Sequence, residues 1–84
     1  MKYKAEVTVT LKNGVRDPQG SAIDTILKRI KLEDSANVNV GKFFKLEVTG
    51  EDEAKIKEKL EYICSEVLSN PVLEKYTVDK FERV

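Results

Sequence analysis

NVNVGKFFKLEVT, residues 37–49, is the stretch of the sequence that decides the fold. Its aliphatic residues and the second of its two phenylalanines keep one alternating phase, which continues through Gly41. The residues in this phase are Val38, Val40, Phe44, Leu46 and Val48. Because successive side chains of a strand point to opposite faces, the pattern predicts one long strand with an apolar face.

This predicted strand is longer than a compact chain of this size can enclose. It spans about 40 Å at roughly 3.3 Å per residue, whereas a compact chain of 84 residues has a diameter of roughly 30 Å. An apolar strand that overhangs its protomer invites aggregation unless another strand pairs with it. The sequence therefore predicts an assembly component whose sheet is extended by oligomerisation.

Gly41 leaves an alternative open, because a glycine inside a strand can mark a bulge, a bend or a hairpin. A two-residue turn at Gly41-Lys42 would place Val38 opposite Lys45 and mix apolar with charged side chains on one face. A three-residue loop would preserve the phase. We therefore favour a continuous or gently bent strand, with the three-residue hairpin as the alternative.

Two more strands are predicted at the ends of the chain. Residues 3–11 alternate apolar and polar side chains, as in a strand with one wet face. Asn13-Gly14 could form a hairpin turn, but the alternation does not resume beyond it, so it ends the strand. From residue 72 the chain is extended again, and the phase changes between Val78 and Phe81. That change predicts a final strand with a bulge or an early end.

Two helices are predicted between these strands. Asp17 is a suitable N-cap for a helix over Pro18–Lys31, because a proline costs nothing at the first helical position. Residues 32–36 then form a polar connection. Thr49 is the expected cap of the second helix, which ends at Asn70-Pro71 because proline cannot supply a helical N–H group.

The order β-α-β-α-β predicts an α+β fold in two layers. We expect a small, mostly antiparallel sheet with two helices on one face, and a single domain over residues 1–84. Cys64 lies on the apolar face of the second predicted helix, where a cysteine usually packs as a small hydrophobe.

Composition excludes several classes of function. The chain has 15 basic and 15 acidic residues, so no net field favours nucleic acid or an anionic membrane. No apolar run approaches the ~18 residues of a membrane span, and the N-terminus lacks the apolar core of a signal peptide. A single cysteine excludes an internal disulfide and fits a reducing compartment. The expected location is the cytoplasm.

The residues that usually carry chemistry are scarce. The sequence has no histidine, which is the commonest general base and metal ligand. The carboxylates considered as metal ligands are Asp17, Asp24, Glu33 and Asp34. They do not have the spacing of a calcium loop. We therefore expect no catalytic, cofactor-binding or metal-binding residues in this chain.

Two short segments are more informative than the charges. Gly20 lies in the first turn of a helix, where glycine costs about 1 kcal/mol relative to alanine. It is either a tolerated surface glycine or a contact where a side chain would block the backbone of a neighbouring chain. In the segment Val40–Phe44, Lys42 is either a solvated residue beside a bend or, with its aromatic neighbours, a contact with a partner subunit.

Several segments together resemble the PurS subunit of phosphoribosylformylglycinamidine synthase. These segments, in chain order, are KAEVTVTLK (4–12), NGVRDPQG (13–20), Ala22-Ile23, VNVGKFF (38–44) and NPVLEKY (70–76). The likeness covers essentially the whole chain. Departures are Asn39, where PurS chains more often carry arginine, and Lys31-Leu32, where a glycine and an aromatic residue are more usual.

The resemblance implies a non-catalytic, homo-oligomeric subunit, dimeric or tetrameric, in de novo purine biosynthesis. The complex would convert formylglycinamide ribonucleotide (FGAR) to formylglycinamidine ribonucleotide (FGAM). A glutaminase subunit would release ammonia, and a synthetase subunit would use it with ATP and magnesium. This chain would bind no cofactor and would help the other two subunits dock.

The hypothetical partner contacts lie in the two short segments and beside them: Arg16, Asp17, Gly20, Gly41, Lys42 and Phe44. Two other classes of function are considered. One is a small-molecule regulatory module of the ferredoxin-like, ACT type. The other is an independent enzyme that uses carboxylates and a tyrosine, for which the candidates are Tyr3, Tyr62 and Tyr76.

Overall fold

The computed structural model describes residues 1–32, 34 and 37–84. In this part of the chain the elements are β1 (Lys2–Leu11), α1 (Pro18–Arg29), β2 (Lys42–Thr49), α2 (Glu53–Ile63), a π-helical turn η1 (Cys64–Leu68) and β3 (Glu74–Arg83). The α+β class and the β-α-β-α-β order are confirmed. Glu33, a candidate metal ligand, and Ser35 and Ala36 of the expected connection lie outside the described residues.

The sheet is antiparallel, with strand order β2-β1-β3. The central strand β1 buries its odd-numbered side chains, and α2 covers them with Ile56 and Leu60. Cys64, the first residue of η1, is fully buried in the same cluster, which confirms its predicted place in the core. Burial raises the pKa of the Cys64 thiol, and the negative charge of Glu61 raises it further.

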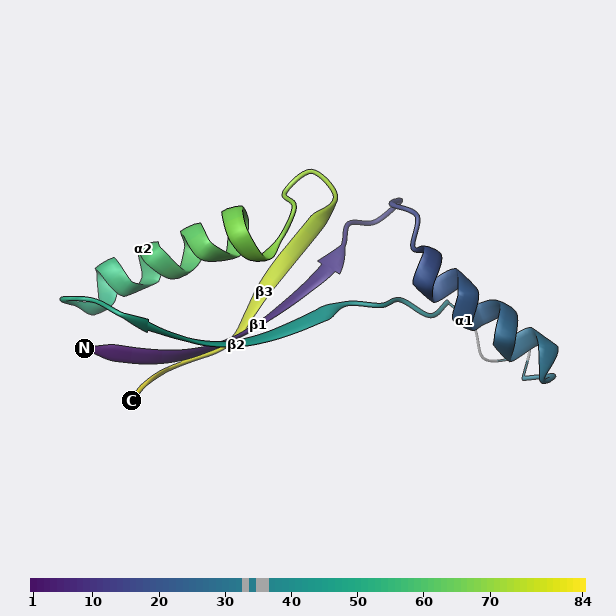
Figure 1. Ribbon diagram of the computed structural model, residues 1–84, viewed down its shortest axis with the longest axis horizontal. Coiled ribbons are helices and arrows are strands. Elements are labelled where there is room, and N and C mark those ends of the chain that lie inside the picture. Colours follow the sequence, from purple (N-terminus) through teal and green to yellow (C-terminus); the bar gives the residue numbers. More distant parts are fainter. Residues whose placement is uncertain (33, 35–36) are drawn as a thin grey trace.

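The long run through Gly41 does not reverse. Its hydrogen-bonded part begins at Lys42, and residues 38–41 continue in the same direction towards α1 (Figure 1). Burial keeps the same phase on both sides of Gly41: Val38 and Val40 are half-buried between exposed neighbours, and the alternation resumes at Phe44 after the exposed Lys42. The hairpin alternative is therefore excluded, although the regular strand is shorter than expected.

The molecule is long and thin, with extents of 54 × 26 × 14 Å. Its radius of gyration is 16.7 Å, whereas a compact chain of this length would have about 12 Å. The predicted overhang is therefore present. It consists of α1 together with the extended residues 38–41, which we call the arm (Figure 1).

The position of α1 differs from the expectation that both helices cover one face. α2 packs on the sheet, whereas α1 lies beyond the end of the sheet, at the far side from the two termini (Figure 1). β1 and β2 are antiparallel neighbours, so the connection that contains α1 leaves the sheet at one end. As a result the apolar stripe of α1 is exposed, and Ile30 is 57% accessible.

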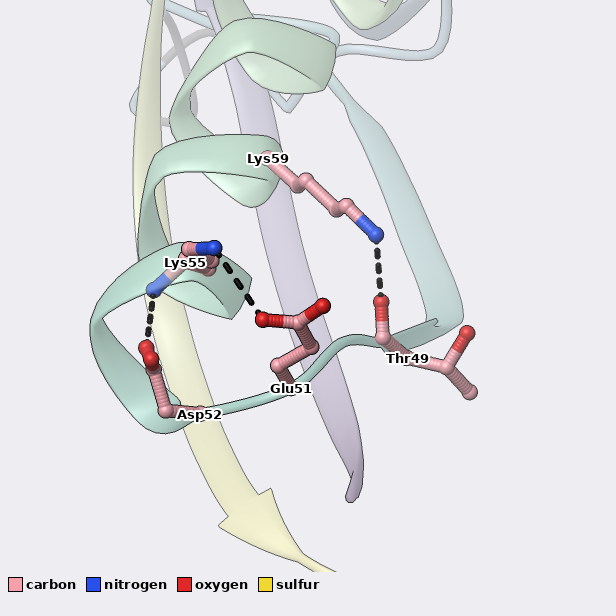
Figure 2. Close-up of polar contacts among 5 residues, drawn as sticks. All are labelled: Thr49, Glu51, Asp52, Lys55 and Lys59. Atoms are coloured by element: carbon pink, nitrogen blue, oxygen red, sulfur yellow. Dashed lines mark hydrogen bonds and ion pairs between the residues drawn. The ribbon is translucent and has the colours of Figure 1, made fainter.

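The cap of α2 also differs from the prediction. Asp52, not Thr49, is the N-cap, and its side chain accepts a hydrogen bond of 2.9 Å from the N–H of Lys55 (Figure 2). Thr49 is the last residue of β2, opposite Lys2, and pairing with β1 continues through Gly50. The Thr49 carbonyl accepts a hydrogen bond of 2.8 Å from Nζ of Lys59 on α2 (Figure 2).

The apolar stripe of the second helix shifts by one residue at its end. In an uninterrupted α-helix Val67 would face the sheet, but it is 68% exposed, whereas Leu68 packs against the core. The N–H of Ser69 donates to the Cys64 carbonyl, five residues back, and so closes the wider π turn.

The predicted irregularity of the last strand is a bulge. The register between β1 and β3 shifts between Glu6 and Val7, so that Asp79 is the extra residue of β3. The bulge accounts for the change of phase between Val78 and Phe81.

α1 ends at Arg29, two residues before the predicted end. The N–H of Lys31 donates to the Lys28 carbonyl, and the N–H of Leu32 donates to the Leu27 carbonyl, which together form a Schellman motif. This motif places Lys31 in the left-handed region, with φ of 64°. A side chain is unfavourable there, which explains why a glycine suits this position.

Replacing Lys31 by glycine should therefore stabilise the protein by about 1 kcal/mol and raise Tm by about 4–8 °C. Differential scanning calorimetry measures the change. Lys28→Gly, in the same helical turn, is the matched control and should lower stability by about 1 kcal/mol. A Tm for Lys31→Gly below that of the wild type would contradict the left-handed assignment.

Candidate partner-binding site

The site is built where the arm meets the sheet, and its central residue is Asp17. One carboxylate oxygen accepts a hydrogen bond of 2.9 Å from the N–H of Gly20, which caps α1 as predicted. The other accepts a bond of 2.9 Å from the N–H of Val40. These N–H groups, Gly20 first, hold the pKa of Asp17 below its ordinary value, so the carboxylate stays charged at neutral pH.

A second carboxylate joins α1 to the extended part of the arm. Asp24 accepts a hydrogen bond of 3.2 Å from the N–H of Val38. Asp17 and Asp24 are seven residues apart and so lie on the same side of the helix. Sequence reasoning considered Asp24 only as a metal ligand. The spacing of the two acids, followed by a strand whose first N–H groups need acceptors, was the signal that could have found it.

Gly20 is buried against the same strand. A Cβ atom on Gly20 would lie 2.1 Å from the Val38 carbonyl oxygen, far inside contact distance. A backbone does approach Gly20 closely, but it is that of Val38 in the same chain, whereas the sequence suggested the backbone of a neighbouring chain.

A groove of about 310 Å³ opens beside this junction. Of the six predicted contact residues, it brings together Asp17, Gly41 and Lys42, and it also includes Glu74 from β3. Gly41 lies close to β1, since a Cβ atom there would be 2.9 Å from both the Val9 carbonyl oxygen and the Thr10 methyl group. The groove is thus lined by two carboxylates and one exposed ammonium group.

The other predicted contacts lie elsewhere. Arg16 is exposed but does not line this groove. Phe44 lies opposite Val7 and packs against the core, so its ring faces inward. Phe43 is the exposed phenylalanine, with 55% of its surface accessible. The sequence pointed to Phe43 only as an aromatic neighbour of Lys42 and named Phe44 as the contact, although the strand phase placed Phe43 on the polar face.

The described residues contain neither a cluster suited to a metal ion nor a helix that could cross a membrane. Among residues 1–32, 34 and 37–84, no three His, Cys, Asp or Glu side chains are grouped so that they could hold a metal ion. Within the same residues, no helix has the length and apolar character needed to cross a membrane.

Comparison with known proteins places the chain in a family. The sequence model of PurS, described as phosphoribosylformylglycinamidine (FGAM) synthase, matches residues 4–82. The chain belongs to the PurS family. The PurS subunit of Methanocaldococcus jannaschii is 35% identical over 82 residues, which is 98% of each chain. The PurS subunit of Bacillus subtilis is 34% identical over 85 residues, covering 98% of this chain and 96% of that one.

Solved PurS structures share the fold. PurS from B. subtilis superposes with a TM-score of 0.82 at 31% identity, over 96% of this chain and 99% of that chain. A chain in the structure of PurLQS from Thermotoga maritima gives a TM-score of 0.78 at 35% identity, over 93% and 95%. The chain is accordingly a PurS-type subunit of an FGAM synthase, a ligase complex of purine biosynthesis. These matches do not favour the ACT-type alternative.

Gly20→Ala tests the junction, because helix propensity and the clash with Val38 predict changes of opposite sign in the free energy of unfolding. Helix propensity alone would stabilise the protein by about 1 kcal/mol. The clash with the Val38 carbonyl should prevail and destabilise it by about 1–3 kcal/mol. Urea denaturation measures the difference, with Gln19→Ala, on the exposed side of the same turn, as control. Greater stability of Gly20→Ala would show that the strand does not approach the helix this closely.

Proposed function

We propose that this chain is a non-catalytic assembly subunit that docks the glutaminase and synthetase subunits of the synthase against each other. The observation that carries the proposal is the arm, which extends the protomer to 54 Å and exposes an apolar stripe on α1. The stripe consists of Ile23, Ile26 and Ile30. A surface of this kind on a small chain is typical of an interaction site.

Docking would help catalysis without bond chemistry in this chain. The glutaminase subunit would hydrolyse glutamine to release ammonia, and the synthetase subunit would use it, with ATP and magnesium, to convert FGAR to FGAM. Ammonia that escapes into neutral water is mostly protonated and is lost as a nucleophile. A subunit that favours the docked state therefore raises the transfer of ammonia through the coupling free energy between its partners. The absence of histidine from the chain is in keeping with such a role.

The groove at the junction is the proposed contact for one of these partners. Asp17 holds α1 and the extended residues 38–41 in one fixed relation, so the groove is formed before a partner arrives. Lys42 offers an exposed charge at its edge. Arg16, Gly20 and Gly41 would then act in or beside this contact, whereas Phe44 would support it from the core.

The same proposal includes self-association, as a dimer or tetramer, and a single domain over residues 1–84 that works in the cytoplasm. The exposed stripe of α1 supports association, because a helix with this apolar pattern is most stable when the stripe is covered. The proposed partners are copies of this chain and the two other subunits, with neither nucleic acid nor a membrane among them.

Omission of this chain from the reconstituted complex tests the function. With glutamine as the nitrogen donor, synthesis of FGAM should fall to a small fraction of the complete system. With ammonium salts as the donor, the synthetase should retain its activity, because docking is then not needed. Turnover by the isolated chain, or undiminished glutamine-dependent activity without it, would refute the proposal.

Lys42→Glu tests the groove. Tm should change by less than about 3 °C, because exposed substitutions usually alter stability by under about 0.5 kcal/mol. The Kd for assembly with the other two subunits should rise about tenfold. Lys80→Glu, the same charge change on β3, is the control and should assemble normally. Equal assembly of both variants, measured by light scattering, would remove Lys42 from the contact.

A further inference from the structure

A second pocket, of about 380 Å³, lies at the junction of the arm and the sheet. Its walls are the end of β1, the turn that follows β1, the extended part of the arm, and one residue of β3. The pocket and the groove share Asp17 and Val40, but the pocket includes Lys75 where the groove includes Glu74. Consecutive side chains of a strand point to opposite faces, so Lys75 and Glu74 lie on opposite faces of the sheet. The docking contact proposed above does not use this pocket.

Two lysines bring positive charge to the pocket. Lys75 lies opposite Thr10, and the N–H of Lys12 donates a hydrogen bond of 2.9 Å to the Leu73 carbonyl. Lys12 and Lys75 are therefore diagonal neighbours, at a spacing of about 7–8 Å that long side chains can bridge. In the part of the chain that the structure describes, neither ammonium group forms an ion pair. An anion between them would relieve the repulsion of the two charges.

Lys12 is held in place without losing its charge. Its Nζ atom donates a hydrogen bond to the Pro71 carbonyl. An ammonium group carries three protons, so two remain available to a ligand. A side chain that is already ordered loses less conformational entropy when a ligand binds. Lys12 is thus preorganised to receive an anion.

The acids beside the pocket are engaged by N–H groups of the chain itself. Asp17 lines the pocket, but each of its carboxylate oxygens accepts one internal hydrogen bond. Glu74, next to Lys75, accepts a hydrogen bond of 2.8 Å from the N–H of Asn70. Among the described residues, the ionisable groups that line the pocket are Asp17, Lys12 and Lys75. Their charges sum to one positive charge at neutral pH.

The other walls of the pocket are mostly polar. Thr10, Asn13 and Asn39 supply a hydroxyl group and two amides. The turn after β1 also lines the pocket, and the N–H groups of Asn13 and Gly14 have no backbone acceptor among the described residues. The pocket therefore offers neutral hydrogen-bonding groups beside its two cations.

We propose that this pocket binds a phosphate monoester with a hydroxylated body, such as a sugar phosphate, with its phosphoryl group between Lys12 and Lys75. A dianion suits two ammonium groups, and lysine binds phosphate as a point charge, whereas the planar fork of arginine suits a carboxylate. The volume falls within the range of small-molecule sites, about 300–1,000 Å³, and leaves room beyond a phosphate group. Asn13 and Asn39 then bind the hydroxyl groups of the body.

Ligand binding by the purified chain tests the pocket. Ribose 5-phosphate should raise Tm progressively with its concentration, because a ligand that binds only the native state stabilises it. Its Kd, measured by titration calorimetry at constant ionic strength, should be about tenfold lower than that of inorganic phosphate, which lacks the body. Ribose and glutamate should give no measurable heat. Absence of binding by ribose 5-phosphate would refute the site, and equal affinity for inorganic phosphate or for glutamate would overturn the ligand class.

Two variants locate the phosphoryl group and the body. Lys75→Gln removes one cation and should raise the Kd for ribose 5-phosphate about tenfold. Asn39→Asp replaces an amide by a carboxylate of similar size and should abolish binding through charge repulsion. Lys80→Gln is the matched control, because Lys80 lies on the polar face of the same strand, opposite Glu6, and outside the pocket. Equal loss in Lys75→Gln and Lys80→Gln, or wild-type binding by Asn39→Asp, would overturn the position.

The inference goes beyond the docking function, and the two can fail separately. Lys75→Gln should assemble with the other two subunits as the wild type does, in the light-scattering measurement used for Lys42→Glu. Loss of assembly together with loss of the ligand would overturn a separate ligand site and assign Lys75 to the docking contact.

Discussion

The constant register between β1 and β2 is the constraint on which the rest of this structure depends. It places the odd residues of β1 and the even residues of β2 on one face, where α2 covers them. It also sends the connection between the two strands out of one end of the sheet, and α1 lies there, beyond the core. The exposed stripe of α1 and the groove at the junction both follow from this pairing.

The junction shows how few polar contacts are needed to fix the arm. Asp17 accepts hydrogen bonds from a helix N–H and from an N–H of the extended segment, and Asp24, about two helical turns later, accepts one more from that segment. Gly20 lets the helix approach the strand at backbone distance. The arm is thereby held as one unit, although it is remote from the hydrophobic core. A partner that bound it would not have to order it first.

Much of this fold could be predicted from particular residues. Alternation in residues 37–49 located β2 and disfavoured the two-residue hairpin. The change of phase before Phe81 indicated the bulge, and Asp17 was identified as a cap. The sequence did not reveal where α1 would lie, because an apolar stripe indicates that a helix has a partner but not which one. Thr49 was the expected cap of α2, but backbone pairing with β1 continues up to Gly50, so the cap is Asp52. Within the candidate site, Phe44 was chosen where Phe43 is exposed, although the phase already distinguished the two.

The π turn η1 has an evolutionary consequence. A π turn accommodates one residue more than an α-helical turn, so it is what a single-residue insertion into an ordinary helix leaves behind. Here the extra residue moves Val67 out to solvent and brings Leu68 to the core, while Ser69 closes the turn on Cys64. Deleting one residue between 65 and 67 would restore an uninterrupted α-helix without moving β3. Homologous chains that are one residue shorter at this point can therefore keep the same fold and the same core.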